Sequence, residues 1–145
     1  RGNDLIFGQL GDDTFLDDTG NNVLVGGDGN DVFRPLAGRN VLIGGQGTDD
    51  LDGAAGHDLL IGGQTAYDDS EVDLLAIARA WARGGSINAK VNALTRGLGR
   101  SGTPFLRLGE SVLDDGLANT LSGGLGADWF LGNCDWVTDL GASDR

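Results

Sequence analysis

The feature that most constrains this chain is a nine-residue repeat running through residues 1–61. The fourth place of each repeat is glycine, the sixth is Asp or Asn, and the eighth is a large apolar residue. In chain order these residues are Gly2, Asp4 and Ile6; Gly11, Asp13 and Phe15; Gly20, Asn22 and Leu24; Gly29, Asp31 and Phe33; Gly38, Asn40 and Leu42; Gly47, Asp49 and Leu51; and Gly56, Asp58 and Leu60. Such regularity indicates a repeat protein whose units are stable only when stacked.

Each repeat predicts a tight turn followed by a short strand. Glycine accepts the positive φ angles that sharp turns need. Side chains alternate along a strand, so the eighth-place residues should point inward while the turns lie outside. Two repeats then form one coil, residues 18 apart lie above one another, and neighbouring coils bury a continuous core.

The sixth-place carboxylates are the candidate metal ligands. Asp13, Asp31 and Asp49 should stack along one edge, where they would repel one another unless a cation lay between them. Carboxylates and the carbonyls of glycine-rich turns suit calcium better than magnesium, because a flexible cage of protein oxygens fits the larger ion. Zinc is disfavoured, because His57 and Cys134 are the only histidine and cysteine and do not cluster.

The opposite edge carries Asp4, Asn22, Asn40 and Asp58. Asparagine offers one neutral oxygen and can close its own turn by hydrogen bonding. We therefore expect calcium between turns 11–13 and 29–31 and between turns 29–31 and 47–49, with two or more ions in the chain. Whether the Asn22 and Asn40 edge binds metal stays open.

Three segments, GGDGNDVFR (26–34), GGQGTDDLD (44–52) and GGLGADWFL (123–131), match the G-G-x-G-x-D-x-U-x signature of a calcium-binding repeat. The chain thus resembles the RTX, or haemolysin-type, family. The resemblance implies an all-β, right-handed parallel β-roll that binds calcium between turns, in a secreted bacterial protein exported by a type I system. The candidate metal residues are Asp13, Asp31, Asp49, Gly11, Gly27, Gly29, Gly45, Gly47, Asp58 and Asp128.

The period stops after Gly63, where a helical excursion is expected. One predicted sheet is apolar on both faces and must be covered. Residues 70–83 predict a helix capped by Ser70, and Ser86 can cap a second. Their apolar faces consist of Leu74, Ile77, Ala78 and Trp81 in the first helix, and of Ile87, Val91, Leu94 and Leu98 in the second. We expect these two helices to cover the apolar sheet.

The nine-residue pattern returns at 114–131 and predicts that the roll resumes, with Asp128 in the column of Asp58 and calcium between their turns. The expected organisation is one domain over 1–145: repeats at 1–63, the helical excursion and return at 64–111, resumed repeats at 112–131 and a cap at 132–145. Trp136 and Val137 in this cap are predicted to bury the last coil of the roll.

Charge and composition exclude several functions. The chain has 22 acidic and 10 basic residues and a net charge of −12, which argues against a nucleic-acid binder. No apolar run approaches the roughly 18 residues of a membrane span. A single histidine without an activated nucleophile assembles no catalytic set, so we expect no enzyme. The chain is expected to be a structural module within a larger exported protein.

The basic residues gather between positions 79 and 107, a stretch that contains no acidic residue. They are Arg79, Arg83, Lys90, Arg96, Arg100 and Arg107. They either hold the helices against the acidic roll and stay in water, or form a polyanion site for an acidic polysaccharide.

Overall fold

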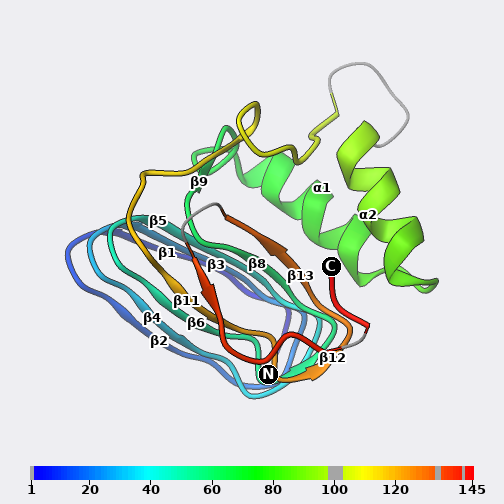
Figure 1. The fold of residues 1–145 in the computed structure, drawn as a ribbon, viewed down its shortest axis with the longest axis horizontal. Helices are drawn as coiled ribbons and strands as arrows, with labels where there is room; N and C mark the ends of the chain where they lie inside the picture. The colour runs from blue at the N-terminus through cyan, green and yellow to red at the C-terminus, as the bar shows by residue number, and fades with distance from the viewer. Residues whose placement is uncertain (1, 98–102, 133–134, 142) are drawn as a thin grey trace.

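The computed structural model describes residues 2–97, 103–132, 135–141 and 143–145, and two parallel sheets wind into a roll (Figure 1). The sheet beneath the helices, here the covered sheet, contains β1 (Leu5–Leu10), β3 (Val23–Asp28), β5 (Val41–Gln46), β8 (Leu59–Ile61) and β13 (Trp129–Leu131). The opposite sheet, here the open sheet, contains β2 (Thr14–Leu16), β4 (Val32–Arg34), β6 (Asp50–Asp52), β11 (Thr120–Ser122) and β14 (Trp136–Val137). Short β7 (Ala55–Gly56) pairs with β12 (Leu125–Gly126), and β9 (Gln64–Thr65) pairs with β10 (Val112–Leu113).

The strand register confirms the predicted coil of two repeats. Leu24 pairs with Ile6 on one side and with Leu42 on the other, each 18 residues away. The next neighbour of Leu60 is Phe130, on the far side of the helical segment. The roll therefore resumes in register, as the returning pattern predicts.

The eighth-place side chains form the interior of the roll. Phe33, Leu42, Leu51 and the other members of this column are buried together, and Leu121 joins them from the resumed repeats. The rings of Phe15 and Phe33 stack with centroids 4.6 Å apart. Ile6, in the first coil, is an exception at 39% exposure.

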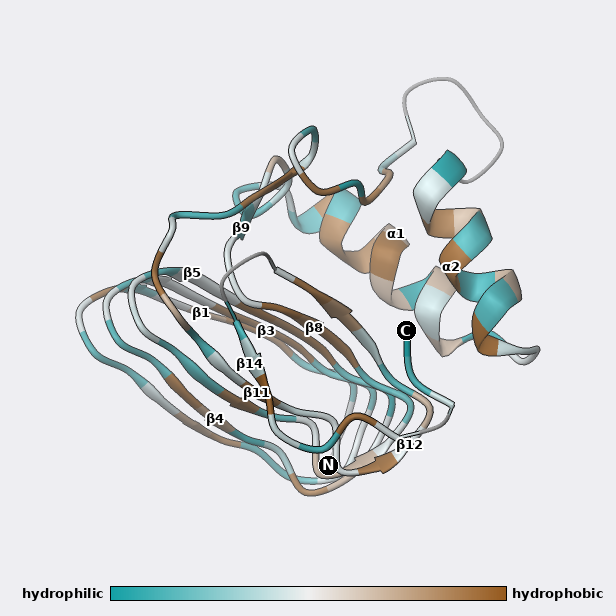
Figure 2. Ribbon diagram, viewed as in Figure 1, coloured by the Kyte–Doolittle hydropathy of each residue, from teal (hydrophilic) through white to brown (hydrophobic). Residues whose placement is uncertain are grey.

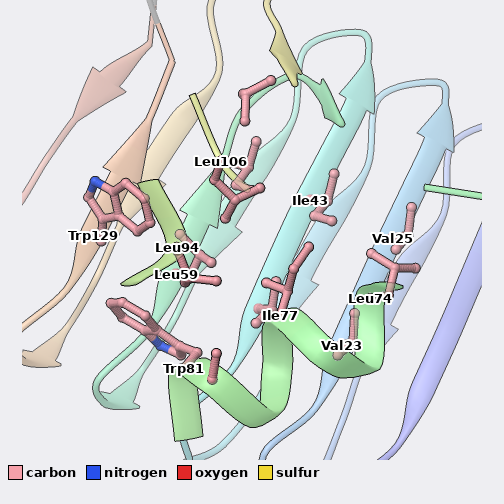
Figure 3. Packing of buried hydrophobic residues seen from close by; sticks show 14 residues of the cluster. Val23, Val25, Ile43, Leu59, Leu74, Ile77, Trp81, Leu94, Leu106 and Trp129 are labelled. Atoms are coloured by element: carbon pink, nitrogen blue, oxygen red, sulfur yellow. The ribbon is translucent and has the colours of Figure 1, made fainter. Parts of the chain in front are cut away.

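Two helices, α1 (Glu71–Ala82) and α2 (Ile87–Arg96), pack over the covered sheet (Figures 2 and 3). Ser70 and Ser86 cap them as the sequence predicts, each accepting a backbone N–H from three residues ahead. Helix α1 buries Leu74, Ile77, Ala80 and Trp81, so Ala80 is the buried alanine and the predicted Ala78 is half-buried. Leu98 lies outside the described residues. No helix in the described part of the chain is long and apolar enough to cross a membrane.

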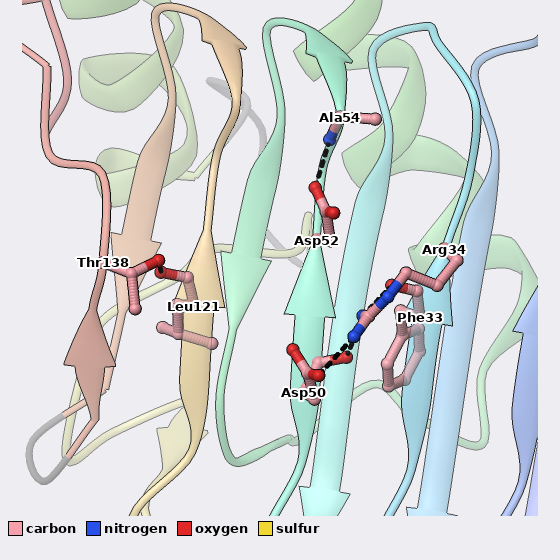
Figure 4. Close-up of polar contacts among 7 residues, drawn as sticks. All are labelled: Phe33, Arg34, Asp50, Asp52, Ala54, Leu121 and Thr138. Carbon is pink, nitrogen blue, oxygen red and sulfur yellow. Dashed lines mark hydrogen bonds and ion pairs between the residues drawn. The ribbon is translucent and has the colours of Figure 1, made fainter.

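The open sheet carries polar side chains on its outer surface (Figure 4). Arg34 donates to the carboxylate and the carbonyl of Asp50 one coil away. Trp136 extends the same surface and is 71% exposed, because its register with Thr120 places it at an outward position. The prediction that Trp136 and Val137 bury the last coil is therefore wrong. Val137 pairs in register with Leu121, but it is 37% exposed. Cys134 lies outside the described residues.

Candidate metal sites in the turns

A ladder of hydrogen bonds fixes the sixth-place side chains. In each turn, the backbone N–H of the sixth residue donates to Oδ1 of the sixth residue in the next coil. Asp13 donates to Asp31 at 2.7 Å, Asp31 donates to Asp49 at 2.8 Å, and Asp49 donates to Asn119 at 2.7 Å. On the opposite edge, Asp58 donates to Asp128 at 2.6 Å. One carboxylate oxygen of Asp31, of Asp49 and of Asp128 thus accepts a backbone N–H.

The second carboxylate oxygen, Oδ2, is buried and has no hydrogen-bond partner among the described residues. This holds for the five predicted ligands Asp13, Asp31, Asp49, Asp58 and Asp128. Buried polar atoms normally find a partner, and an unpaired buried charge is costly. These oxygens are therefore free to bind a cation.

The first glycine of each repeat makes room for this oxygen. A Cβ added at Gly26 would lie 2.2 Å from Asp31 Oδ2 and 2.4 Å from the carbonyl oxygen of Gly44. The same cradle recurs one coil later, where a Cβ at Gly44 would lie 2.3 Å from Asp49 Oδ2 and 2.5 Å from Gly62 O. A carboxylate oxygen and a carbonyl oxygen from adjacent coils thus converge. Calcium takes ligands of both kinds, so these residues fit it.

These first-place glycines are absent from the residues predicted from sequence. They are Gly8, Gly26, Gly44 and Gly62 on the Asp13 edge, and Gly53 and Gly123 beside Asp58 and Asp128 on the other edge. The paired glycines that open each full repeat are the signal that could have identified them, since two adjacent glycines imply two separate steric demands. The first makes room for the carboxylate, and the second meets the neighbouring turn.

The predicted glycines at the second and fourth places shape the turns. Gly11, Gly27, Gly29, Gly45 and Gly47 all have positive φ, between 100° and 142°. A Cβ at Gly45 would come within 2.0 Å of the Gly27 carbonyl oxygen in the preceding coil. Glycine at these places therefore permits both the left-handed backbone and the close stacking of turns.

Burial raises the pKa of the stacked carboxyls, because a charged form loses solvation inside the turns. The pKa of Asp49 rises to about 7, that of Asp58 to about 8 and that of Asp128 to about 6. Burial also raises the pKa of Asp31, and the neighbouring Asp13 charge adds to the effect. At neutral pH a cation would relieve both the desolvation and the repulsion.

The asparagine side chains of the opposite edge accept the same backbone hydrogen bonds, but they leave no free oxygen for a metal. Asp4 N–H donates to Asn22 Oδ1 at 3.0 Å, and Asn22 N–H donates to Asn40 Oδ1 at 3.1 Å. The ladder turns Oδ1 toward the backbone, so Nδ2 occupies the place of the free carboxylate oxygen. An amide N–H₂ is a donor and cannot ligate a cation. On this edge the geometry therefore favours metal at Asp58 and Asp128.

Two further carboxylates continue the ladders beyond the predicted sites. Asn119 N–H donates to Asp135 Oδ1 at 3.2 Å, and Asp128 N–H donates to Asp144 Oδ1 at 3.0 Å. Both steps span 16 residues, because the segment linking Asp128 to Asp135 is two residues shorter than a full repeat. The sequence does contain a signal for Asp135, because this residue directly precedes the strand-like segment WVT. The shortened spacing takes it out of the nine-residue pattern.

No group of three or more His, Cys, Asp or Glu side chains converges in the part of the chain that the structure describes. A zinc site of such ligands is accordingly not seen there. The cradles instead pair one carboxylate with backbone carbonyls. His57 is occupied differently, since its Nδ1 accepts the backbone N–H of Ala127 at 2.8 Å.

Comparison with known families agrees with this geometry. The model of the RTX calcium-binding nonapeptide repeat matches four copies, at residues 1–16, 8–35, 36–64 and 115–133, which together cover more than half of the chain. The chain belongs to the RTX calcium-binding repeat family. No curated protein and no solved structure gave a match. In this RTX chain the matched segments leave out residues 65–114, which contain both helices.

The basic residues of that unmatched segment do not all share one surface. Arg79, Arg83 and Arg96 line a groove between α1 and α2. Lys90 is only 5% exposed, and its Nζ lies 5.0 Å from the ring centroid of Trp81. Arg107 pairs with Glu110 at 3.3 Å, and Arg100 lies outside the described residues. Three of the six predicted residues are thus brought together.

Proposed function

We propose that this chain is a calcium-binding structural module that folds when calcium enters its stacked turns. The observation that carries the proposal is the column of buried, unpartnered Oδ2 atoms beside glycine carbonyls. Asp13, Asp31 and Asp49 would supply one edge, and Asp58 with Asp128 would supply the other. The cradles are assembled only when coils stack, so calcium binding contributes directly to the free energy of folding.

The biological setting follows from the calcium dependence. RTX repeats are typical of secreted bacterial proteins, and a type I route would suit a chain that stays loose where calcium is scarce. Without calcium, stacking of the turns would bring their carboxylates into mutual repulsion. Outside the cell, calcium would drive folding. The module would catalyse no reaction itself and would be covalently part of a larger exported protein.

The finer features of the fold belong to the same proposal. We take the coils to be right-handed, since connections between parallel strands of one sheet almost always are. The helical excursion would serve as a cover that keeps the apolar outer face of the covered sheet from water.

A calcium titration followed by far-UV circular dichroism, with magnesium as the control ion, tests the proposal. Strand signal should develop with calcium and not with equal magnesium, because magnesium retains its waters and demands a stricter geometry. A chain equally folded in chelator and in calcium would contradict the proposal. Hydrogen bonds and packing would then suffice to close the turns.

A calcium-stabilised module that binds an acidic polysaccharide is the second candidate function. The observation in its favour is the convergence of Arg79, Arg83 and Arg96 on one groove. Loss of polyanion binding on neutralising these arginines, with calcium-dependent folding intact, would support it.

A further inference from the structure

The groove between α1 and α2 has a composition unlike the rest of the molecule. It encloses about 680 Å³ and is lined by Arg79, Arg83 and Arg96, by Asn92, by Gly97 and by four alanines. No acidic residue lines it, although acidic residues outnumber basic ones in the chain by 22 to 10. The groove is therefore a local basic site on an acidic protein.

Its arginines are not neutralised by the protein. Among the described residues, no acidic side chain forms an ion pair with Arg79, Arg83 or Arg96, whereas Arg34 pairs with Asp50 and Arg107 pairs with Glu110. Arg79 lies in the last turn of α1 and Arg83 follows the end of that helix, and both line the groove together with Arg96. Three arginines that line one groove without an acidic partner point to an anionic ligand.

We propose that this groove binds a uronic-acid segment of an acidic polysaccharide, and that calcium controls the binding through the roll. The proposal rests on the second candidate function above. Guanidinium groups hold carboxylates with paired, charge-assisted hydrogen bonds. The alanine floor leaves room for the apolar face of a sugar ring, and the Asn92 amide can bond its hydroxyls. Nucleic acid suits the groove less, because its dense phosphates would also face the acidic roll.

The calcium control follows from how the groove is built. Helices of 12 and 10 residues are marginal by themselves in water. Here they are held by Leu74, Ile77 and Leu94, which are buried against the covered sheet (Figure 3). Trp81 Nε1 also donates to the His57 carbonyl oxygen at 2.6 Å. The arginines can converge only on a folded roll, so ligand and calcium should strengthen each other's binding.

The test is a calorimetric titration of the chain in saturating calcium with a short oligogalacturonate. The parent chain should bind, and a triple variant Arg79→Gln, Arg83→Gln, Arg96→Gln should bind roughly a hundredfold more weakly. The matched control is Arg34→Gln on the open sheet, which removes one positive charge away from the groove and should bind as the parent does. A triple Arg→Lys variant keeps the charge but loses the planar fork, and should bind with intermediate affinity.

Circular dichroism of each variant separates the two proposals. A chain that folds with calcium but binds no oligogalacturonate, or whose triple Gln variant binds like the parent, overturns the inference and leaves the folding function standing. Tighter binding of duplex DNA than of the oligosaccharide overturns it as well. If the triple Gln variant fails to fold, the Arg→Lys variant decides, and parent-like binding by it contradicts the forked contact. Oligogalacturonate binding that is equal in chelator and in calcium refutes the calcium control.

Discussion

Replacing Asp31 by Asn is the sharpest test of the proposed metal edge, because the chain already has asparagine at the equivalent place of other turns. Asn22 and Asn40 occupy the same place on the opposite edge and keep the Oδ1 ladder. Asp31→Asn should likewise keep its hydrogen bond from Asp13 N–H and exchange only the free oxygen for an amide nitrogen. Asp31 is 0% exposed, so the substitution removes a fully buried charge.

The expected result has opposite signs with and without calcium. In chelator the variant should be at least as stable as the parent, because it no longer buries an unpaired carboxylate. In calcium at about a hundredfold excess over Kd, the loss of one site removes about 2.7 kcal/mol from the stabilisation that calcium gives the parent. The strand signal in circular dichroism compares the two chains in chelator, and urea unfolding in calcium measures the lost stabilisation.

The matched control is Asp28→Asn, which makes the same charge change at an exposed position at the end of β3. It should leave the calcium increment unchanged. If Asp31→Asn weakens folding equally in chelator and in calcium, the side chain is only structural, and the reasoning about its free oxygen is refuted.

Three further predictions follow from the turns and the helices. Gly45→Ala should prevent calcium-dependent folding, seen by circular dichroism, because its Cβ would collide with the Gly27 carbonyl oxygen; a folded variant would contradict the stacking. In chelator, the folded fraction of the chain should fall as pH rises from about 4 to 8, because the folded pKa of Asp58, about 8, exceeds the unfolded value and the folded chain holds the extra proton. The strand signal in circular dichroism across pH measures this. Saturating calcium should remove the decline, and an equal decline with calcium would argue against binding there. Trp81→Phe leaves the His57 carbonyl without its donor and should cost about 1–3 kcal/mol in urea unfolding, whereas an unchanged midpoint would show that the contact is dispensable.

The coil of two repeats could be predicted because every column repeats at one spacing. The 18-residue step from Asp13 to Asp31 and the inward position of Leu42 follow from side-chain alternation alone. The position of Asp128 beyond the helical segment could be predicted in the same way. The place of a residue within its repeat determines on which edge of the roll it lies, whatever the length of the interruption.

The rest depended on details that a period does not contain. Asp135 was missed because a shortened turn breaks the spacing by two residues. The role of Gly26 was missed because the pattern shows that glycine is required, but not what a side chain there would strike. Trp136 was misjudged because hydrophobicity suggested burial, whereas its register with Thr120 turns it outward. The sequence also could not show which of the six basic residues share one surface. The structure excludes Lys90 from the groove, because Lys90 is buried against Trp81.

Calcium positions in a crystal grown with calcium, located by anomalous scattering, test the central claim most directly. Peaks should lie beside the Oδ2 atoms of Asp13, Asp31 and Asp49 on one edge and beside Asp58 and Asp128 on the other, with glycine carbonyls completing the coordination. No peak should lie between Asn22 and Asn40. A roll whose free carboxylate oxygens contact only water or protein donors, with no calcium peak beside them, would contradict the account.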